Sequence, residues 1–273
     1  MFLSRYRKAV DTFAPPLGRS YRLLRDSTNR RRAIQTPYGF SLAGDPSMAS
    51  GGWEADEIAV FLELIATHEA VLDIGANIGF YSCLAASRGK QTIAIEPAPR
   101  NLKFLYRNLW DNRFTGVEIL PVGLGSHPGL ARIYGYGGIA SFVPGWAQAR
   151  ESQSTLAPLT TLDAIAAERF RGKKLLIKMD VEGFELDVLA GARRTLELAP
   201  RPTWLIEILF RDDAIPGGIS PKFAEAFSVF WERGYRCRKL DRAGTPVEPD
   251  DVSRWVSQGR VDGETHDFFF GAD

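Results

Sequence analysis

The sequence of 273 residues contains few cysteines and histidines, and it has no long apolar run. Its two cysteines, Cys83 and Cys237, are far apart and belong to no CxxC pair, which argues against a disulfide framework. Three histidines leave too few ligands for an ordinary structural zinc site. No stretch approaches the roughly 20 apolar residues that span a bilayer, and charges interrupt the start of the chain, where a secretory signal would be apolar. We therefore expect a cytoplasmic protein without a transmembrane segment.

Net charge is also nearly absent, because 34 Lys and Arg face 33 Asp and Glu. The balance of +1 gives no general attraction to nucleic acid or to an anionic membrane. Residues 1–34 nevertheless carry nine basic and two acidic side chains, so this part sums to +7 and the rest of the chain to −6. We interpret residues 1–35 as a basic N-terminal extension. Two kinds of role are open for this extension. It is either a solvated arm or dimer contact, or an anchor to an acidic surface, such as a membrane, or to a polyanionic substrate.

Through the remaining residues, 36–273, short apolar stretches alternate with segments of helical periodicity. The expected strands are 70–74, 91–96, 117–124, 174–180, 203–209, 235–240 and 267–271. The expected helices are 54–67, 81–87, 98–110, 162–170, 185–198 and 222–231. Residues 125–158, rich in Gly, Ser and Pro, predict an inserted hairpin or lid. This alternation is typical of an α/β domain built from right-handed βαβ units around a mostly parallel sheet.

A glycine turn follows the first expected strand and precedes a helix. Asn77 stands where a dinucleotide-binding turn has its second glycine. The turn therefore lacks a glycine that lets the backbone approach a pyrophosphate, which argues against a dinucleotide. Asp73, just before the turn, suits the ammonium group of an amino acid, and Gly75 lets the backbone approach a ligand. Glu96 ends the next strand at the spacing at which an acid accepts hydrogen bonds from ribose hydroxyls. Together these features favour S-adenosylmethionine. A packing turn without a ligand and a nicotinamide cofactor are the alternatives.

A second group of acidic residues follows the strand at 174–180. Asp180 and Glu182 fall at its carboxyl end, where open α/β sheets bind ligands. Glu207 lies near the carboxyl end of the next expected strand, at the same edge of the sheet. Lys178 lies on the same face of its strand as Asp180. We predict a catalytic role for the three acids, with Asp180 or Glu182 as a general base or as the group that binds an acceptor hydroxyl. A divalent metal such as Mg²⁺ on these three carboxylates is an alternative that we do not favour, and a purely structural role is another.

These motifs, in this order, resemble the FkbM-type methyltransferases. The resemblance is carried by the run DIGANIGFY at 73–81, by Glu96-Pro97 with Asn101 and Asn108, by Thr161-Leu162-Asp163, and by the run KMDVEGFE at 178–185 with Leu189 and Gly191. Residues 36–40 and Trp53-Glu54 look like the lead-in of that family, and the resemblance covers roughly residues 36–210. It implies a class I Rossmann-like fold with seven strands in the order 3-2-1-4-5-7-6, the last of them antiparallel. It also implies O-methylation of hydroxyls on sugars, glycans or polyketide-like small molecules.

Carried over position by position, the resemblance assigns eight residues to the cofactor. They are Glu54, Asp73, Gly75, Asn77, Gly79, Glu96, Val122 and Gly123. The turn would hold the methionine end, Glu96 the ribose, and Val122-Gly123 would lie near the adenine. Asp180 and Glu182 would face the transferring methyl group.

Two other functional classes stay open at this point. A nucleic-acid methyltransferase would use the basic arm, but the chain has no Asn-Pro-Pro-Tyr motif and its body is acidic, so we expect no nucleic acid partner. A cofactor-binding module without catalysis is the other class. We expect a small-molecule or glycan acceptor, for which the aromatic stretch 134–146 would form a lid. Homo-oligomerisation and peripheral membrane contact through the basic N-terminus are left open.

Overall fold

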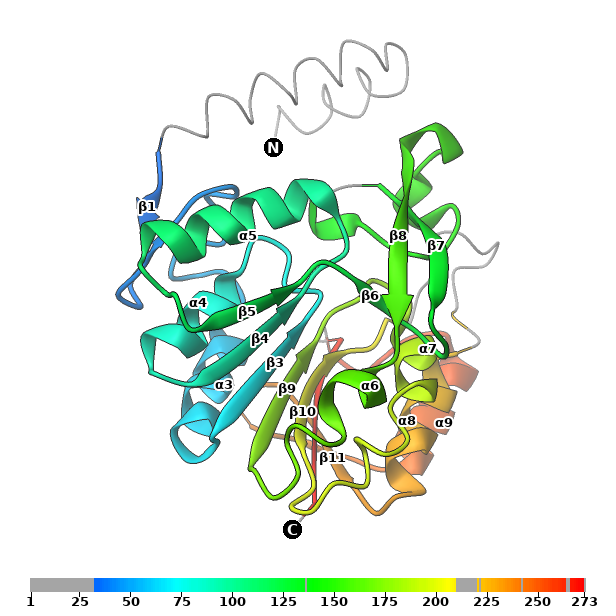
Figure 1. Ribbon diagram of the computed structural model, residues 1–273. Helices are drawn as coiled ribbons and strands as arrows, with labels where there is room; N and C mark the ends of the chain where they lie inside the picture. The colour runs from blue at the N-terminus through cyan, green and yellow to red at the C-terminus, as the bar shows by residue number, and fades with distance from the viewer. Residues whose placement is uncertain are drawn as a thin grey trace. The chain divides into compact units, whose positions relative to one another are not determined.

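The computed structural model describes residues 32–135, 137–209, 220, 222–241, 243–263 and 266–272 (Figure 1). The prediction for the basic segment therefore lies almost entirely outside the described residues. The chain divides into two compact units, Met1–Trp53 and Glu54–Asp273, whereas the sequence places a boundary at 35/36. In the described part of the first unit, β1 (Ile34–Gln35) and β2 (Ser41–Leu42) pair antiparallel.

The second unit is built on an eight-stranded sheet. Its strands are β3 (Ala70–Ile74), β4 (Gln91–Ile95), β5 (Val117–Leu120), β9 (Leu175–Met179), β10 (Thr203–Glu207), β11 (Arg236–Lys239), β12 (Pro246–Val247) and β13 (Asp267–Gly271). They lie in the order β12-β11-β13-β10-β9-β3-β4-β5, and β13 is antiparallel to both of its neighbours. Seven of these strands have the order that the family resemblance implies. The eighth, β12, is a two-residue addition at the edge that the sequence did not predict.

Helices cover both faces of this sheet (Figure 1). They are α3 (Ala55–Thr67), α4 (Phe80–Ser87), α5 (Pro99–Asp111), α6 (Leu162–Ala166), α7 (Glu185–Ala190), α8 (Phe223–Trp231) and α9 (Pro249–Gln258). The central strands β3 and β9 are buried along their whole length, as expected for parallel strands with helices on both sides. On one face, α8 packs its phenylalanines against those of β13, with the rings of Phe230 and Phe270 stacked 4.0 Å apart. None of the helices in the described part of the chain is both long and apolar enough to be a membrane span.

Three expected elements are corrected by the structure. The strand predicted at 117–124 is interrupted at Pro121, whose ring nitrogen cannot donate a ladder hydrogen bond. Beyond it, β6 (Gly123–Leu124) joins a separate three-stranded sheet with β7 (Gly129–Tyr134) and β8 (Ser154–Thr160). The helices predicted at 162–170 and 185–198 are shorter, since α6 ends at Ala166 and α7 at Ala190. Helix α9, which begins with a proline and a capping box, was not predicted.

The region of the predicted insertion contains a β-hairpin. Strands β7 and β8 pair antiparallel from Gly129 opposite Leu159 to Tyr134 opposite Ser154. The connection between them contains three short 3₁₀ turns, at Gly137–Ile139, Trp146–Gln148 and Glu151–Gln153. This hairpin brings residues far along the chain to the carboxyl edge of the main sheet.

Candidate functional site

The turn after β3 is held against the end of β9. Gly75 has φ +79°, and its N–H donates to the carbonyl of Ile95 at 2.9 Å. A Cβ on Gly75 would lie 1.8 Å from the backbone oxygen of Asp180, so only glycine fits here. The next turn residue, Asn77, has φ +51°, a conformation that asparagine tolerates better than most residues. The sequence pattern of the turn therefore has a steric cause: it lets two strand ends meet.

Glu96 is fixed by this turn at the end of β4. Its Oε2 accepts the N–H of Asn77 at 2.8 Å, and its Oε1 accepts the N–H of Ala98 at 2.7 Å. The side chain is 3% exposed, and this burial raises the pKa of Glu96 to about 7, although both backbone N–H groups act in the opposite direction. The side chain of Asn101 hydrogen-bonds the same carboxylate. A carboxylate has about four lone-pair positions, so one stays available for a hydroxyl donor from a ligand.

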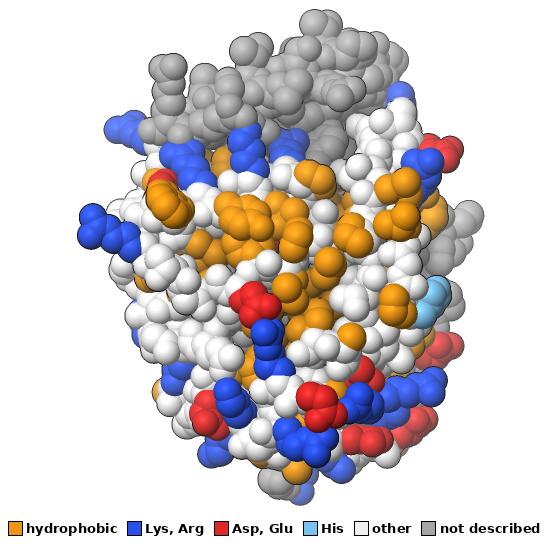
Figure 2. Space-filling view, viewed as in Figure 1, with side chains coloured by type: hydrophobic (Ala, Val, Ile, Leu, Met, Phe, Trp, Pro, Cys, Tyr) orange, Lys and Arg blue, Asp and Glu red, His pale blue; other side chains and the backbone are white. Residues whose placement is uncertain are grey.

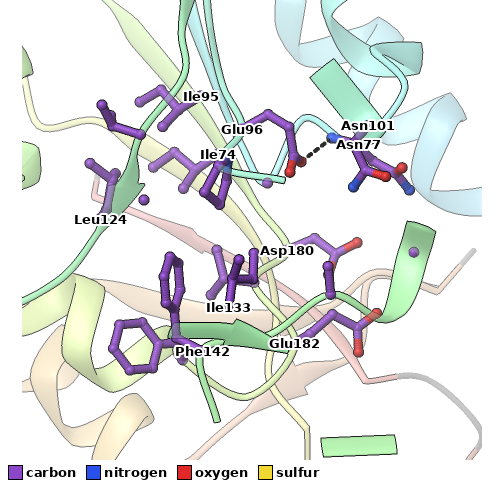
Figure 3. A pocket seen from close by; sticks show the side chains of 18 of the residues that line it. Ile74, Asn77, Ile95, Glu96, Asn101, Leu124, Ile133, Phe142, Asp180 and Glu182 are labelled. Carbon is purple, nitrogen blue, oxygen red and sulfur yellow. Dashed lines mark hydrogen bonds between the residues drawn. The ribbon is translucent and has the colours of Figure 1, made fainter. Parts of the chain in front are cut away.

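A pocket with about 530 Å³ of empty space, part of it open to solvent, connects these groups (Figure 3). Seven of the eleven predicted site residues line it: Gly75, Asn77, Glu96, Val122, Gly123, Asp180 and Glu182. In Figure 3, Glu96 lies beside Asn77 and Asn101, whereas Asp180 and Glu182 lie on the other side of the pocket. The two motifs that the sequence singled out separately are thus brought together in one cavity.

The other four predicted residues lie outside the pocket lining. Asp73 is buried beneath the turn, where the hydroxyl of Ser82 donates to its Oδ2 at 2.5 Å. Burial raises the pKa of Asp73 to about 6. Glu54 accepts a hydrogen bond from the hydroxyl of Tyr81 at 2.8 Å. Gly79 begins α4, and a Cβ there would be 2.5 Å from a methyl carbon of Leu105. These three positions shape the turn and its support, and their contact with a cofactor stays a prediction.

Glu207, the fourth, lies behind the pocket against Asp180. Burial raises the pKa of Glu207 well above its ordinary value, and the charges of Asp180 and Asp267 and a hydrogen bond with Asp180 raise it further. The raised pKa favours the protonated form of Glu207, whose hydroxyl can donate a hydrogen bond to the carboxylate of Asp180. One oxygen of Asp180, Oδ1, is buried without a hydrogen-bond partner among the described residues. Asp180 Oδ1 is thus a buried acceptor, in a residue of the pocket lining, that the described residues leave unsatisfied.

Glu182 is held by the inserted hairpin. The indole nitrogen of Trp146 donates to its Oε2 at 2.9 Å, and the hydroxyl of Ser141 donates to its backbone oxygen at 2.6 Å. Burial, followed by the charge of Asp180, raises the pKa of Glu182 to about 8. Phe142, in the same connection, lines the pocket with its ring 5.3 Å from that of Phe184. The sequence predicted an aromatic lid from this stretch but did not identify Ser141 or Phe142 individually.

A buried ion pair supports the acidic side of the site. The ammonium of Lys178 lies 2.9 Å from a carboxylate oxygen of Glu57, and the two side chains are 4% and 3% exposed. Burial alone would lower the pKa of Lys178, but Glu57, Asp180 and other acids hold it well above its usual value. The sequence analysis missed Glu57. The available signal was a glutamate at the spacing i, i+4 from Phe61, inside the apolar stripe of α3.

Asp180, Glu182 and Glu207 can each bring one carboxylate oxygen within 4.8 Å of the others. This donor set is chemically suited to a hard cation such as Mg²⁺. The same closeness raises the pKa of Glu182 and Glu207, so protons already reduce the repulsion between the carboxylates. The geometry is therefore compatible with a metal without requiring one.

Comparison with known proteins links this geometry to a family. Residues 73–237, more than half of the chain, match the family described as the Methyltransferase FkbM domain. The hexuronic acid methyltransferase AglP of Haloferax volcanii is 30% identical over 151 residues, which are 53% of this chain and 58% of AglP. The chain thus matches less than two thirds of that relative's length.

Solved structures give looser similarities. The methyltransferase FkbM of Methylobacillus flagellatus KT is 21% identical, with 75% of this chain and 44% of that chain covered and a TM-score of 0.45. Fibrillarin of Aeropyrum pernix, solved with natively bound S-adenosyl-L-methionine, is 12% identical. The match covers 80% of this chain and 76% of fibrillarin, with a TM-score of 0.42. Both TM-scores are below 0.5, so the assignment depends on the sequence match over residues 73–237 and not on these structures. On that match, the chain belongs to the FkbM methyltransferase family.

Proposed function

We propose that the protein is an S-adenosylmethionine-dependent O-methyltransferase whose acceptor is a hydroxyl of a sugar, a glycan or a related small-molecule natural product. The observation that carries this proposal is the shared pocket: a buried acid, Glu96, lies on one side of it, and the acids Asp180 and Glu182 lie on the other. The first group suits a nucleoside, and the second suits a hydroxyl that must lose its proton. Family membership supports the same reaction class.

The residues present fit the cofactor. Glu96 keeps acceptor capacity for a ribose hydroxyl, and Val122 and Gly123 line the same pocket, where an adenine would lie. The turn at Gly75 and Asn77 offers backbone close to the ligand without a pyrophosphate cradle. When bound, the cofactor supplies a methyl group that its sulfonium activates.

The contribution of the chain is alignment and proton transfer. Correct alignment of nucleophile and methyl group accounts for on the order of 7–11 kcal/mol in well-oriented reactions. An alcohol needs a base within hydrogen-bond reach, and Asp180 Oδ1 is an acceptor without a partner among the described residues. Glu182, with its pKa raised to about 8, is suited to take up a proton near neutral pH. We assign to these two carboxylates the binding and deprotonation of the acceptor hydroxyl, and to Glu207 the positioning of Asp180.

The acceptor class is supported by two observations. The relative AglP is named as acting on a hexuronic acid, which is a sugar. The hairpin places Phe142 in the pocket wall and Trp146 on Glu182, and aromatic faces pack well on sugar rings. Transfer of a labelled methyl group to one member of a panel of sugars and glycans would support this class. Tight cofactor binding with no transfer to any of them would favour a non-catalytic module instead.

Binding of S-adenosylhomocysteine is expected to weaken as the pH falls. A ribose hydroxyl donates best to the ionised carboxylate of Glu96. Because the pKa of Glu96 is about 7, the ionised fraction drops about 10-fold from pH 8 to pH 6. Calorimetry at several pH values should show this loss, and Glu96→Gln should bind about 10- to 100-fold more weakly with no such pH dependence. Equal affinity in Glu96→Gln, or readily detected NADH binding in place of S-adenosylhomocysteine, would contradict the cofactor assignment.

Methyl transfer is expected to survive removal of divalent metals. The raised pKa values of Glu182 and Glu207 reduce the negative charge of the three carboxylates, so we expect that no cation is needed to hold them together. Dialysis against a chelator, followed by an assay with and without added Mg²⁺, measures this. A complete loss of turnover that Mg²⁺ restores would show that Asp180, Glu182 and Glu207 are metal ligands.

A further inference from the structure

Helix α5 exposes two large aromatic side chains to solvent. Tyr106 is 51% exposed and Trp110 is 81% exposed, and they lie four residues apart, which places them on one face of the helix. Beside them is a mostly apolar groove. It is lined by Tyr106, Leu109, Trp110, Phe114, Val117 and Ile119, together with Asp111, Arg113 and Thr115. The groove reaches β5, the last strand of the sheet. Tryptophan is seldom exposed to this extent without a partner surface.

The apolar character continues beyond the helix. Figure 2 shows hydrophobic side chains over α5 and β5 and further ones toward β7 and β8. Leu130 of β7 is 72% exposed and Leu156 of β8 is 59% exposed. Their strands are paired with Arg132 directly opposite Leu156, so Leu130 and Leu156 project from the same face of that small sheet. We call Tyr106, Trp110, Leu130 and Leu156, together with the basic residues described next, the α5 surface.

The charges around this aromatic pair are mainly basic. Helix α5 carries Arg100, Lys103 and Arg107, and Arg113 lies two residues beyond its end. The only acid of α5, Asp111, forms an ion pair with Arg107 at 3.2 Å. This helix is therefore cationic, although the chain outside residues 1–34 sums to −6.

We propose that the α5 surface docks on an anionic lipid bilayer. Tryptophan and tyrosine with neighbouring lysine and arginine are the side chains that favour the boundary between headgroups and acyl chains. Exposed leucines gain from contact with acyl chains, whereas a nucleic acid would offer them little. A second copy of the chain on the same face would bring the basic side chains of α5 together, and like charges repel. An anionic membrane satisfies both the apolar and the cationic parts of the surface.

The test is cosedimentation of the full chain with vesicles of phosphatidylcholine containing phosphatidylglycerol. Binding is expected to these vesicles and to be much weaker to pure phosphatidylcholine or in high salt. Trp110→Ser should lower the partition coefficient about 10-fold, and Lys103→Glu at least about 5-fold, because each removes one of the two kinds of contact. The matched control is Val256→Ser, which changes an apolar side chain that is 41% exposed on α9 and lies outside the α5 surface.

All of these variants keep residues 1–31, so a difference between them is assigned to the α5 surface and not to the basic N-terminus. Circular dichroism and the melting temperature should be unchanged, because Trp110 is mostly exposed. Vesicle binding that Trp110→Ser and Lys103→Glu leave at the wild-type level would overturn the proposal. So would a dimer, seen in sedimentation equilibrium, that Trp110→Ser dissociates while vesicle binding is absent. Neither result would bear on methyl transfer, which is tested separately.

Discussion

Asp180→Asn is expected to lower the rate of methyl transfer by about 100-fold or more, the usual contribution of a positioned base. The backbone of Asp180 is fixed, because its N–H donates to the carbonyl of Ile74 at 3.0 Å and its own carbonyl lies against Gly75. The side chain therefore presents Oδ1 at a constant place in the pocket wall. An asparagine of the same shape keeps this geometry but cannot accept a proton. Steady-state kinetics should show the loss in kcat, and calorimetry should show an unchanged affinity for S-adenosylhomocysteine.

The matched control for this variant is Asp187→Asn. Asp187 is a partly exposed acid of α7 that forms an ion pair with Lys222 at 2.7 Å, away from the pocket lining. Its replacement should leave kcat near the wild-type value. In Asp180→Asn the pKa of Glu182 should fall, because the charge of Asp180 helps to raise it. Wild-type turnover in Asp180→Asn would remove this residue from the mechanism and leave Glu182 as the candidate base.

The sequence was sufficient for the central strands and for the contents of the pocket. The short, mostly apolar stretches at 70–74 and 174–180, each set between helical segments, are typical of buried parallel strands. The carboxyl ends of neighbouring parallel strands meet at one edge of the sheet. This is why Glu96, Asp180 and Glu182 lie in one cavity. The strand order came from the family resemblance, because local pattern does not specify which strands are neighbours.

What the sequence could not show depends on contacts between distant segments. Ser141 and Trp146 look like ordinary residues of a polar loop, and only the folding of the hairpin places them on Glu182. The end of β5 just before Pro121 was hidden by apolar residues on both sides of the proline. Glu207 was predicted at the site, but its place behind Asp180 follows from the register of β10 against β9, which no local pattern encodes.

Lys178→Met is expected to destabilise the fold by about 3–5 kcal/mol, the usual cost of leaving one buried charge without its partner. Lys178 is the cation that faces Glu57 at 2.9 Å, and its charge also lowers the pKa of Glu54, Glu182 and Asp267. Without it, the acids on this face of the sheet repel one another in a buried setting. Thermal unfolding should show a melting temperature lower by about 10 °C.

The double variant Lys178→Met/Glu57→Leu separates this cause from a loss of packing. When both charges of a buried pair are replaced by apolar groups, the cost of desolvating them disappears, and the net change is often small. The double variant should therefore recover most of the stability that Lys178→Met loses, which a double-mutant cycle measures as a coupling energy. If the double variant is as unstable as Lys178→Met, the ion pair is not the cause. In that case the contact of Lys178 with the ring of Tyr81, 5.4 Å from its centroid, becomes the explanation to test.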